Sequence, residues 1–374
     1  MTPSSIARRR LGNQRISKTA FTRPEQVVKW LGAVQAQDYA AAKWAVGLRA
    51  HGLTDSGLDQ ALADGTLLRT HVMRPTWHFV SPEDIRWLLA LTAPRVHAAN
   101  AYPYRTLELD PATFLKSNAA LARALRDGKQ LTRDELASAL QRAGIDASGL
   151  RLNYLIMHAE LDGVICSGAR RGKQFTYALF EERVPASKPL EHEEALAELA
   201  RRYFTSREPA TEQDFMWWSG LSRADVRRGI ELVRRDLAKD TIEGKTYWFA
   251  ASTQSARDPL QSVYLLPNLD EYVVGYTDRS AIFDSSRADQ LDARSSPLFQ
   301  HTIVVHGQIA GTWKRTLGKD SVTVEAHPFA QWEDTESRAI ELAAQRYGEF
   351  LELPSVLVEM ERENGERSLV WTKI

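Results

Sequence analysis

Apolar stretches of helical period alternate with polar breaks along this chain, and most of the predicted helices begin at a recognisable cap. At each cap a hydroxyl residue stands three positions before an acid, so that the two side chains can satisfy the free amides of the first helical turn. The apolar residues that follow predict amphipathic helices packed on a core. The predicted starts are Thr22 to Glu25, Ser81 to Asp84, Thr132 to Glu135, Thr211 to Asp214, and Ser222 to Asp225.

Two stretches repeat the same order of predicted elements. In residues 129–184 a short helix, a glycine turn and a helix from about Leu150 to Leu161 precede two β-prone runs. In residues 190–250 the order is the same, with the second helix predicted over Arg223 to Leu237. Helix, turn, helix and two-stranded wing is the pattern of a winged helix.

The rest of the chain divides into three parts. Residues 1–81 hold a third, looser copy of this order, with Arg74-Pro75 as the turn of its hairpin, and residues 82–128 predict a helical linker. Residues 258–374 contain short β-prone runs, Tyr272 to Val274 among them, and one amphipathic helix. We therefore predict an α+β fold of tandem winged-helix units and a β-rich C-terminal unit.

Composition is ordinary for a globular protein. The chain has 374 residues, 43% of them hydrophobic and 26% charged, which predicts two to four compact units and excludes a collagen-like or largely disordered chain. It has no apolar run of membrane-spanning length, and its first ten residues are polar and Arg-rich. We expect a cytoplasmic protein that does not associate with a membrane.

Cysteine content and net charge narrow the chemistry. Cys166 is the one cysteine of the sequence, so an intrachain disulfide and a cysteine-based zinc cluster are both excluded. Lys plus Arg and Asp plus Glu are each 48, so no global charge attracts nucleic acid. Binding to phosphate depends on local charge, however, and several segments are strongly basic.

Basic and aromatic residues gather on the predicted second helices and on one predicted wing. In the helix from Leu150, the apolar positions leave a cation, a phenol and an imidazole on an outer face, which suits phosphate and base contacts. A solvated helix face and a basic loop are the alternative interpretation. The candidate DNA-binding residues are Arg151, Tyr154, His158, Arg170, Arg171, Lys173, Arg223 and Arg227.

Familiar catalytic signatures are absent from the sequence. It lacks a phosphate-binding P-loop, a dinucleotide-binding glycine motif, a nucleophile elbow and a zinc-protease motif. His71 and His78 lie seven positions apart with no thiol nearby, so we expect no metal site. We also expect no cofactor.

The unusual segment is Val34 to Tyr39, in which Gln35 and Gln37 flank one alanine. On a helix these two side chains would point about 200° apart, whereas on extended backbone they project to the same side. A glutamine amide is a poor base, but it both donates and accepts hydrogen bonds and can hold a water molecule. From the pattern alone, a helix end with solvated amides is the favoured interpretation.

Several motifs together resemble one family. They are VQAQDYAAAKWAVGLR, LLRTHVMRPTWHFVSPEDIRWLL, LLPNLDEYVVGYTDR and GQIAGTWKR, set among the tandem winged-helix patterns. Together they are similar to the AlkZ and YcaQ family of bacterial DNA glycosylases over nearly the whole chain. The resemblance implies winged-helix units arranged around a C-terminal β domain, with a concave surface that binds DNA.

The resemblance also implies a reaction and its residues. Members excise alkylated bases and can unhook interstrand crosslinks, using Gln, an apolar residue, and then Gln or Asp. Gln35 and Gln37 match the AlkZ-like form as catalytic residues, while Asp38 comes one position too late for the aspartate of the YcaQ-like form. We expect a monofunctional glycosylase acting on N7- or N3-alkylated purines in duplex DNA. Further candidate substrate contacts are Asp38, His71, Arg74, Thr76 and His78.

Two other functions fit the same patterns. Winged helices more often read DNA than cut it, so a non-enzymatic transcriptional regulator is the main alternative. A protein-interaction scaffold, with the arginines as rim charges, is the second. Three predicted units in one chain favour a monomer that wraps a single duplex.

Overall fold

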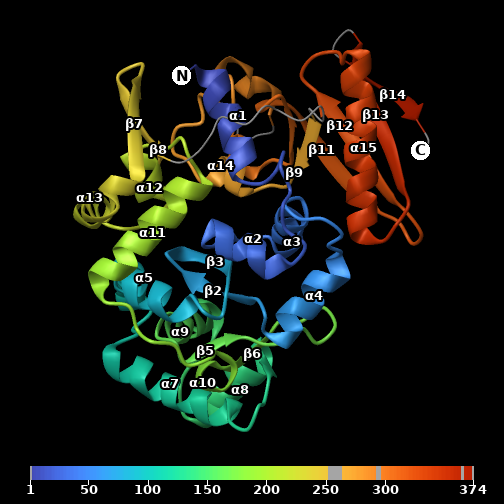
Figure 1. Cartoon of the computed structure of the whole chain (residues 1–374). Coiled ribbons are helices and arrows are strands. Elements are labelled where there is room, and N and C mark those ends of the chain that lie inside the picture. Colours follow the sequence, from blue (N-terminus) through green and yellow to red (C-terminus); the bar gives the residue numbers. More distant parts are fainter. Residues whose placement is uncertain (1, 252–262, 292–295, 364–365, 373–374) are drawn as a thin grey trace. The chain divides into compact units, whose positions relative to one another are not determined.

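A computed structural model describes residues 2–251, 263–291, 296–363 and 366–372, with side chains described as far as residue 359. Helices and sheets are both abundant, in agreement with the α+β prediction (Figure 1). The chain forms two compact units. The first unit comprises residues 1–58, 201–218 and 233–374, and the second comprises 59–200 and 219–232. The predicted start of the C-terminal unit, near Asp258, lies outside the described residues.

A six-stranded sheet dominates the first unit. Its strand order is β14-β13-β12-β11-β10-β9, in which β12 and β13 run parallel and the other neighbours antiparallel. Helix α15 buries Ile340, Ala344 and Tyr347 on one stripe, and its Tyr347 ring lies 5.1 Å from that of Trp313 in the sheet. The elements are β9 Val263–Leu266, β10 Thr302–Val305, β11 Gln308–Leu317, β12 Val322–Pro328, α15 Asp334–Leu351, β13 Ser355–Glu363 and β14 Glu366–Thr372.

N-terminal elements, a hairpin and a short helix complete the first unit. Trp44 on α3 donates from its indole Nε1 to the carbonyl of Leu265 at 2.7 Å, which attaches that helix to strand β9. A two-stranded hairpin, β7 and β8, turns at Glu243 and Gly244, which both adopt positive φ. The elements are α1 Pro3–Asn13, α2 Pro24–Leu31, β1 Val34–Gln35, α3 Tyr39–Gly47, β7 Leu237–Ile242, β8 Lys245–Ala250 and α14 Glu271–Val274.

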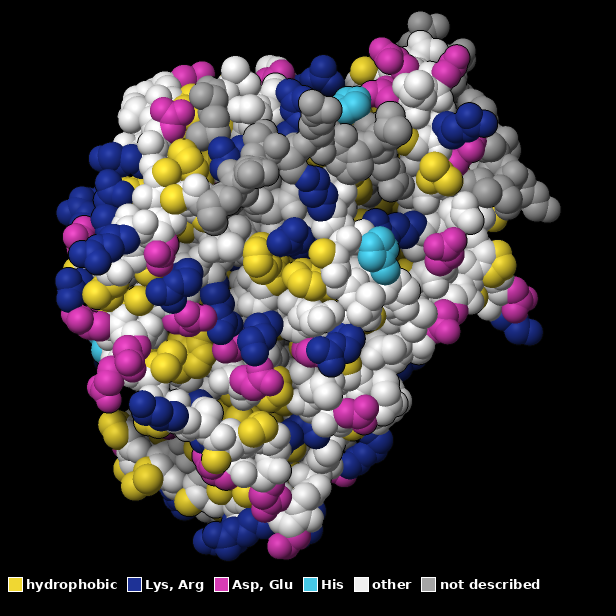
Figure 2. Space-filling model, in the orientation of Figure 1, with side chains coloured by type: hydrophobic (Ala, Val, Ile, Leu, Met, Phe, Trp, Pro, Cys, Tyr) yellow, Lys and Arg dark blue, Asp and Glu magenta, His cyan; other side chains and the backbone are white. Residues whose placement is uncertain are grey.

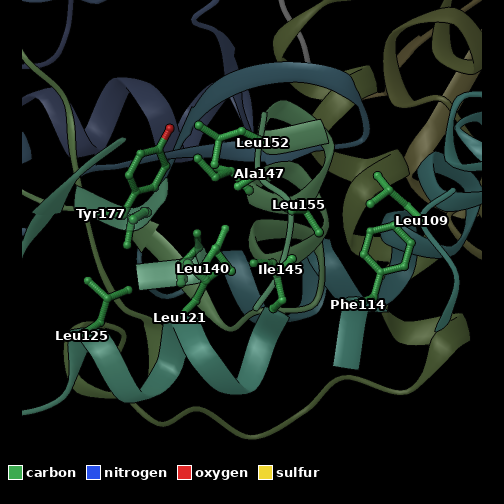
Figure 3. Packing of buried hydrophobic residues seen from close by; sticks show 14 residues of the cluster. Leu109, Phe114, Leu121, Leu125, Leu140, Ile145, Ala147, Leu152, Leu155 and Tyr177 are labelled. Carbon is green, nitrogen blue, oxygen red and sulfur yellow. The ribbon is translucent and has the colours of Figure 1, made fainter. Parts of the chain in front are cut away.

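Short strands and packed helices form the second unit. Helices α7, α8 and α9 share a core in which Leu121, Leu136, Leu140 and Leu155 are fully buried (Figure 3). The elements are β2 Leu68–Val72, β3 Arg74–Val80, α5 Ile85–Ala99, α6 Ala101–Thr106, α7 Pro111–Leu125, β4 Leu131–Thr132, α8 Arg133–Arg142, α9 Gly149–Leu161, β5 Ile165–Ser167, β6 Thr176–Leu179, α10 Phe180–Arg183 and α13 Arg223–Leu232.

Three helices contain points at which the chain passes from one unit to the other. They are α4 Asp55–Asp64, α11 His192–Ser206 and α12 Glu212–Ser219. Within the described ranges, none of the helices is both long and apolar enough to cross a membrane.

Three predicted helix starts form as the spacing indicates. Thr132 and Glu135 cap α8 reciprocally, and the side chain of Thr211 accepts from the amide of Asp214. The hydroxyl of Ser222 likewise accepts from the amide of Asp225. Each bond satisfies a backbone amide that has no partner inside the helix.

Two other starts differ from the prediction. Helix α2 begins at Pro24, and the side chain of Gln26, rather than that of Glu25, accepts from the amides of Thr22 and Arg23. Ser81 donates to Asp84 as a hydroxyl–carboxylate pair, but α5 begins only at Ile85.

Three predicted elements are wrong. Tyr272 to Val274 form a helical turn, because the buried Asp270 side chain accepts from the amide of Tyr272 and caps it. Helix α13 ends at Leu232, and Leu237 opens strand β7. Arg74 begins strand β3, so the hairpin turns at Met73, whose φ is 62°.

Candidate active site

The segment with the two glutamines is not helical, with Gln35 in a short strand and Gln37 in a bend. Val34 and Gln35 form strand β1, Ala36 and Gln37 are non-helical, and α3 begins only at Tyr39. Gln35 is buried and Gln37 is exposed. The side-chain carbonyl of Gln35 accepts a 2.6 Å hydrogen bond from the backbone amide of Gln37. The backbone of Gln37 therefore fixes the side chain of Gln35.

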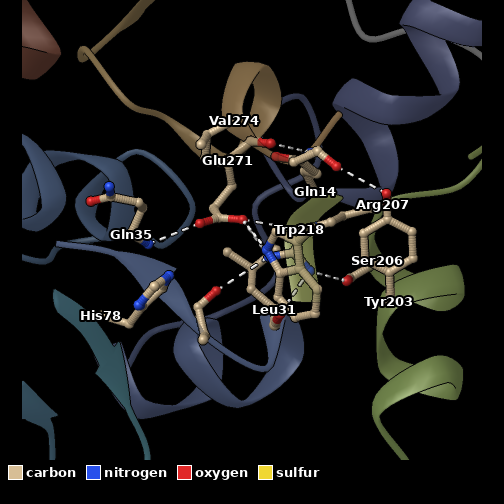
Figure 4. Close-up of polar contacts among 12 residues, drawn as sticks. Gln14, Leu31, Gln35, His78, Tyr203, Ser206, Arg207, Trp218, Glu271 and Val274 are labelled. Atoms are coloured by element: carbon tan, nitrogen blue, oxygen red, sulfur yellow. Dashed lines mark hydrogen bonds and ion pairs between the residues drawn. The ribbon is translucent and has the colours of Figure 1, made fainter. Parts of the chain in front are cut away.

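The buried carboxylate of Glu271 anchors the backbone of this segment. The backbone amide of Gln35 donates to Oε1 of Glu271 at 2.8 Å, while Oε2 accepts from Nη2 of Arg207 at 2.6 Å and from the indole of Trp218 at 2.9 Å. Figure 4 shows the side chain of Gln35 pointing away from Glu271, with its backbone nitrogen toward the carboxylate. The carboxylate therefore fixes the backbone and leaves the glutamine amide directed elsewhere.

Arg207 holds the preceding residues of the same segment. Its guanidinium donates to the carbonyls of Leu31 at 2.7 Å and Ala33 at 3.2 Å, and to the hydroxyl of Ser206 at 2.9 Å (Figure 4). Arg207 and Glu271 are both fully buried, and such a pair is stable only when its remaining hydrogen bonds are also satisfied. The buried ion pair thus contacts both the last residue of helix α2 and the residues that precede Gln35.

The neighbouring acid forms a second buried ion pair. Asp270 accepts two hydrogen bonds from Arg49, at 2.7 and 2.8 Å, in the bidentate geometry that favours arginine. Gln14 accepts from the same guanidinium at 2.8 Å and donates to the backbone carbonyl of Glu271 at 3.1 Å. The Asp270 carboxylate and the Gln14 side chain thus connect α14 to the residues that follow helices α1 and α3.

Asp38 caps helix α3 and contacts Asn268 in the turn after strand β9. Its Oδ1 accepts from the amide of Ala41 at 3.1 Å, and its Oδ2 accepts from the side chain of Asn268 at 3.3 Å. The backbone amide of Asn268 donates to Nδ1 of His301 at 3.1 Å, so Nδ1 of His301 carries no proton. Burial lowers the pKa of His301 to about 4, and the charge of Arg315 acts in the same direction.

The predicted substrate contacts in the β2–β3 hairpin have protein partners. His71 is buried, and its Nδ1 lies 2.5 Å from Oε2 of Glu160. His78 is fully buried, with Nδ1 3.0 Å from the carbonyl of Thr76 and Nε2 3.5 Å from the guanidinium of Arg74. Thr76 and Arg74 are themselves partly buried. The hairpin therefore holds an ordered polar group whose members contact one another.

The expected exposed stripe on α9 is wrong in part. Arg151 forms an ion pair with Asp146 at 3.3 Å, and Tyr154 packs against the core of the second unit. The side chain of His158 is only 15% exposed and stacks on Phe114 with ring centroids 3.7 Å apart. The apolar face of α9 is buried as predicted, but helix α7 packs against the remaining face through Phe114.

Asp162, directly after α9, is the charged neighbour of His158. Burial acts to raise the pKa of Asp162, but contacts with His158 and His97 outweigh it and hold that pKa well below its usual range.

Cations remain on the surface elsewhere in the second unit. Arg171 and Lys173 are exposed in the β5–β6 loop, although Arg171 pairs with Glu135 at 2.8 Å, and Arg170 lies over the ring of Phe175 at 5.3 Å. Arg223 and Arg227 are exposed on α13. Figure 2 shows dark blue side chains gathered over α13, with acidic side chains between them.

Sequence reasoning missed Arg207, Glu271 and Asn268. Glu271 follows Asp270 within an otherwise apolar run from Leu269 to Val274, and two acids in such a run indicate buried, paired charges. Arg207 gave no comparable signal, because its partners lie 64 and 176 positions away in the chain.

Comparisons with known proteins agree on one family. A family model described as "DNA glycosylase AlkZ-like" matches residues 28–350. A curated protein of Streptomyces sahachiroi, "Interstrand DNA cross-link repair glycosylase", is 26% identical over 331 residues, covering 85% of this chain and 88% of the relative. The solved structure "Streptomyces sahachiroi DNA glycosylase AlkZ" is similar in fold, with a TM-score of 0.79, 22% identity, and coverage of 96% of this chain and 100% of that one.

Proposed function

Because this chain belongs to the AlkZ-like DNA glycosylase family, we propose that it hydrolyses the N-glycosidic bond of purines alkylated at N7 or N3 in duplex DNA. The enzyme class follows from the family, whereas the lesion is our proposal. A relative named for interstrand cross-link repair supports adding crosslinked purines to the substrates. The observation that carries the assignment is the non-helical Gln35–Ala36–Gln37 segment, which Glu271 and Arg207 hold in place.

The chemistry suits neutral amides. A purine alkylated at N7 is already cationic, so the electron pair of the breaking glycosidic bond neutralises it and it leaves as a neutral base. The enzyme then needs to position a water molecule and to stabilise the positive charge that develops on the sugar. Both tasks require fixed dipoles rather than a strong acid.

The two glutamines divide these tasks. With its Oε1 bound to the amide of Gln37, Gln35 presents its Nε2 amino group as a donor to the water oxygen. Gln37 directs its side-chain carbonyl toward the water proton and the charged sugar. The water oxygen bonds to the anomeric carbon and its proton passes to solvent, which leaves an abasic site and a free base. The proposal includes no lysine Schiff base and no cofactor.

Asp38 has a structural role in this mechanism. Its carboxylate caps α3 and contacts Asn268, and these contacts hold Asp38 in place directly after Gln37. A direct role for Asp38 in activating water is not needed, because the proposal assigns that water to Gln35 and Gln37.

DNA binding is proposed for the helix–turn–helix and hairpin stretches, interpreted as winged helices that line a concave surface. Their cations would contact phosphates, with Arg223 and Arg227 on α13 and Arg170, Arg171 and Lys173 in the β5–β6 loop. His71, Arg74, Thr76 and His78 are proposed to shape the substrate side of the hairpin. We further propose a monomeric, cytoplasmic enzyme.

The function is tested by incubating the whole chain with duplexes that carry N7-methylguanine, N3-methyladenine or a purine crosslink. We expect free modified base, identified by mass spectrometry, and an abasic site that is cleaved only after alkali treatment. Binding to undamaged DNA with no base released from any of these duplexes would instead support the transcriptional-regulator alternative and overturn the proposal.

A further inference from the structure

Three potential metal ligands converge in the second unit, away from the glutamine segment in the chain. Nε2 of His97 lies 3.1 Å from Oδ1 of Asp162, and Nδ1 of His158 lies 3.1 Å from Oδ2 of the same carboxylate. One ligand atom from each of the three residues lies within 4.8 Å of the others. A single carboxylate is therefore placed between two imidazoles.

The fold fixes this arrangement from two helices. His158 and Asp162 are four positions apart at the end of α9, so they lie on one face, one turn apart. His97 comes from the last turn of α5. A histidine and a second ligand at this spacing form a chelating pair, as in helical zinc motifs.

Neighbouring side chains orient the three residues. Nδ1 of His97 lies 3.1 Å from the hydroxyl of Tyr104, which turns Nε2 toward Asp162. The ring of Phe114 stacks on His158, and Asn118 donates to Oδ2 of Asp162 at 2.8 Å. Outer contacts of this kind set the ring orientation and tautomer of histidine ligands in metal proteins.

Two buried polar atoms of this cluster lack hydrogen bonds. Nδ1 of His158 is close to the carboxylate but not aligned for a hydrogen bond, and Oδ1 of Asn118 also has no partner. Buried polar atoms are normally satisfied, and a site that binds an ion is one recognised reason for an exception. A cation between His158 and Asp162 would satisfy the imidazole directly. A half-turn of the Asn118 amide would bring its oxygen to the same point.

We propose that His97, His158 and Asp162 bind a divalent transition-metal ion of the zinc class, with Asn118 as an additional oxygen ligand. Two imidazoles and one carboxylate favour Zn²⁺, Co²⁺ or Ni²⁺ over Mg²⁺ and Ca²⁺, which take oxygen ligands. Ligands of a tetrahedral zinc ion lie roughly 3.4 Å apart, given bonds of about 2.1 Å, so only small shifts from the present 3.1 Å contacts are needed.

An ion can reach this cluster from solvent. The side chains of Asp162 and His97 are 35% and 25% exposed, and both residues line a surface cavity of about 400 Å³. The bound ion would join α5 to α9 and stabilise the second unit. The site shares no residue with the proposed catalytic pair, Gln35 and Gln37, or with the cations proposed to contact DNA.

The test titrates Zn²⁺ into the whole, untagged, chelator-treated chain by calorimetry and follows its thermal unfolding. We expect saturable binding of one equivalent, a raised unfolding temperature, and no competition from Mg²⁺. Co²⁺ in place of Zn²⁺ should give visible d–d absorption typical of nitrogen and oxygen ligands.

Conservative variants locate the ion. His97→Gln and His158→Gln should each weaken Zn²⁺ binding by at least about 10-fold. His192→Gln is the matched control: His192 also neighbours an acid, Asp225 at 3.5 Å, and should bind Zn²⁺ like the native chain after substitution. Failure of the folded native chain to bind Zn²⁺, or unchanged affinity in both cluster variants, would overturn the proposal.

Discussion

The backbone amide of Gln35 donates a 2.8 Å hydrogen bond to Oε1 of Glu271, a fully buried carboxylate 236 positions further along the chain. The same carboxylate binds Arg207 and Trp218 through its other oxygen. A loop segment that carries candidate catalytic side chains is thus fixed by an interior ion pair. Precise positioning of this kind is what a reaction without a strong acid or base requires.

Substituting this carboxylate should destabilise the protein. Glu271→Gln leaves the guanidinium of Arg207 buried without a counter-charge, so we expect the free energy of unfolding to fall by about 3 kcal/mol. Urea denaturation measures the change. Glu181→Gln is the control, because Glu181 forms an exposed pair with Arg86 and should cost less than about 1 kcal/mol. Equal effects of the two variants would contradict the anchoring role of Glu271.

Asp38 should tolerate one substitution and not another. Asp38→Asn keeps an oxygen that can cap α3, so we expect little change in unfolding free energy, whereas Asp38→Ala should lose about 1 kcal/mol. Base excision should follow the same order, since the carboxylate is assigned a structural role. An Asp38→Asn protein that is fully stable but inactive would show that the charge takes part in catalysis.

His301 should make stability depend on pH below neutrality. Burial lowers its pKa from 6.5 to about 4, so between these values the unfolded chain holds more protons than the folded one. Stability from this group is therefore complete above about pH 6.5 and is lost as pH falls toward 4, with a slope of up to about 1.4 kcal/mol per pH unit. Comparing urea denaturation of the native chain with His301→Gln isolates this slope, which should be absent in the variant. Parallel pH curves for the two proteins would show that His301 is not kept neutral.

Arginines on α13 should differ in their contribution to DNA binding. Arg227→Ala should weaken binding to an undamaged duplex and reduce the slope of log affinity against log salt by about 0.9. Arg228→Ala is the control, because Arg228 is also exposed on α13 but is not one of the proposed phosphate contacts. Fluorescence anisotropy at several salt concentrations measures both. Identical slopes for the native chain and Arg227→Ala would remove this residue from the proposed interface.

Local rules predicted much of the fold. The Thr132 to Glu135 cap, the Thr211 to Asp214 cap and the amphipathic stripe of α9 depend on neighbours in the sequence, and all three form as expected. At the glutamines the pattern alone favoured a helix end with solvated amides, whereas Gln35 is buried in a short strand and Gln37 lies in a bend. The β-prone run Tyr272 to Val274 became a helical turn because a buried carboxylate caps it, which is a tertiary effect.

The site itself was only half predictable. Gln35 and Gln37 stand out as a pattern, whereas the residues that hold them, Glu271 and Arg207, are brought together only by folding. His158 shows the opposite error: spacing placed it on an outer face, but Phe114 of another helix covers its ring. Sequence periodicity identifies the apolar face of a helix. It does not show which elements pack against the remaining face.

The central claim is that Gln35 and Gln37 position water during base excision. Its most direct test is the single-turnover rate of N7-methylguanine release by Gln35→Ala and Gln37→Ala, with DNA affinity measured in parallel and Gln60→Ala, an exposed glutamine on α4, as control. We predict that each variant of the pair loses about 100-fold in rate while DNA affinity and the control rate stay at the native level. Undiminished release by both Gln35→Ala and Gln37→Ala, with binding intact, would contradict the account.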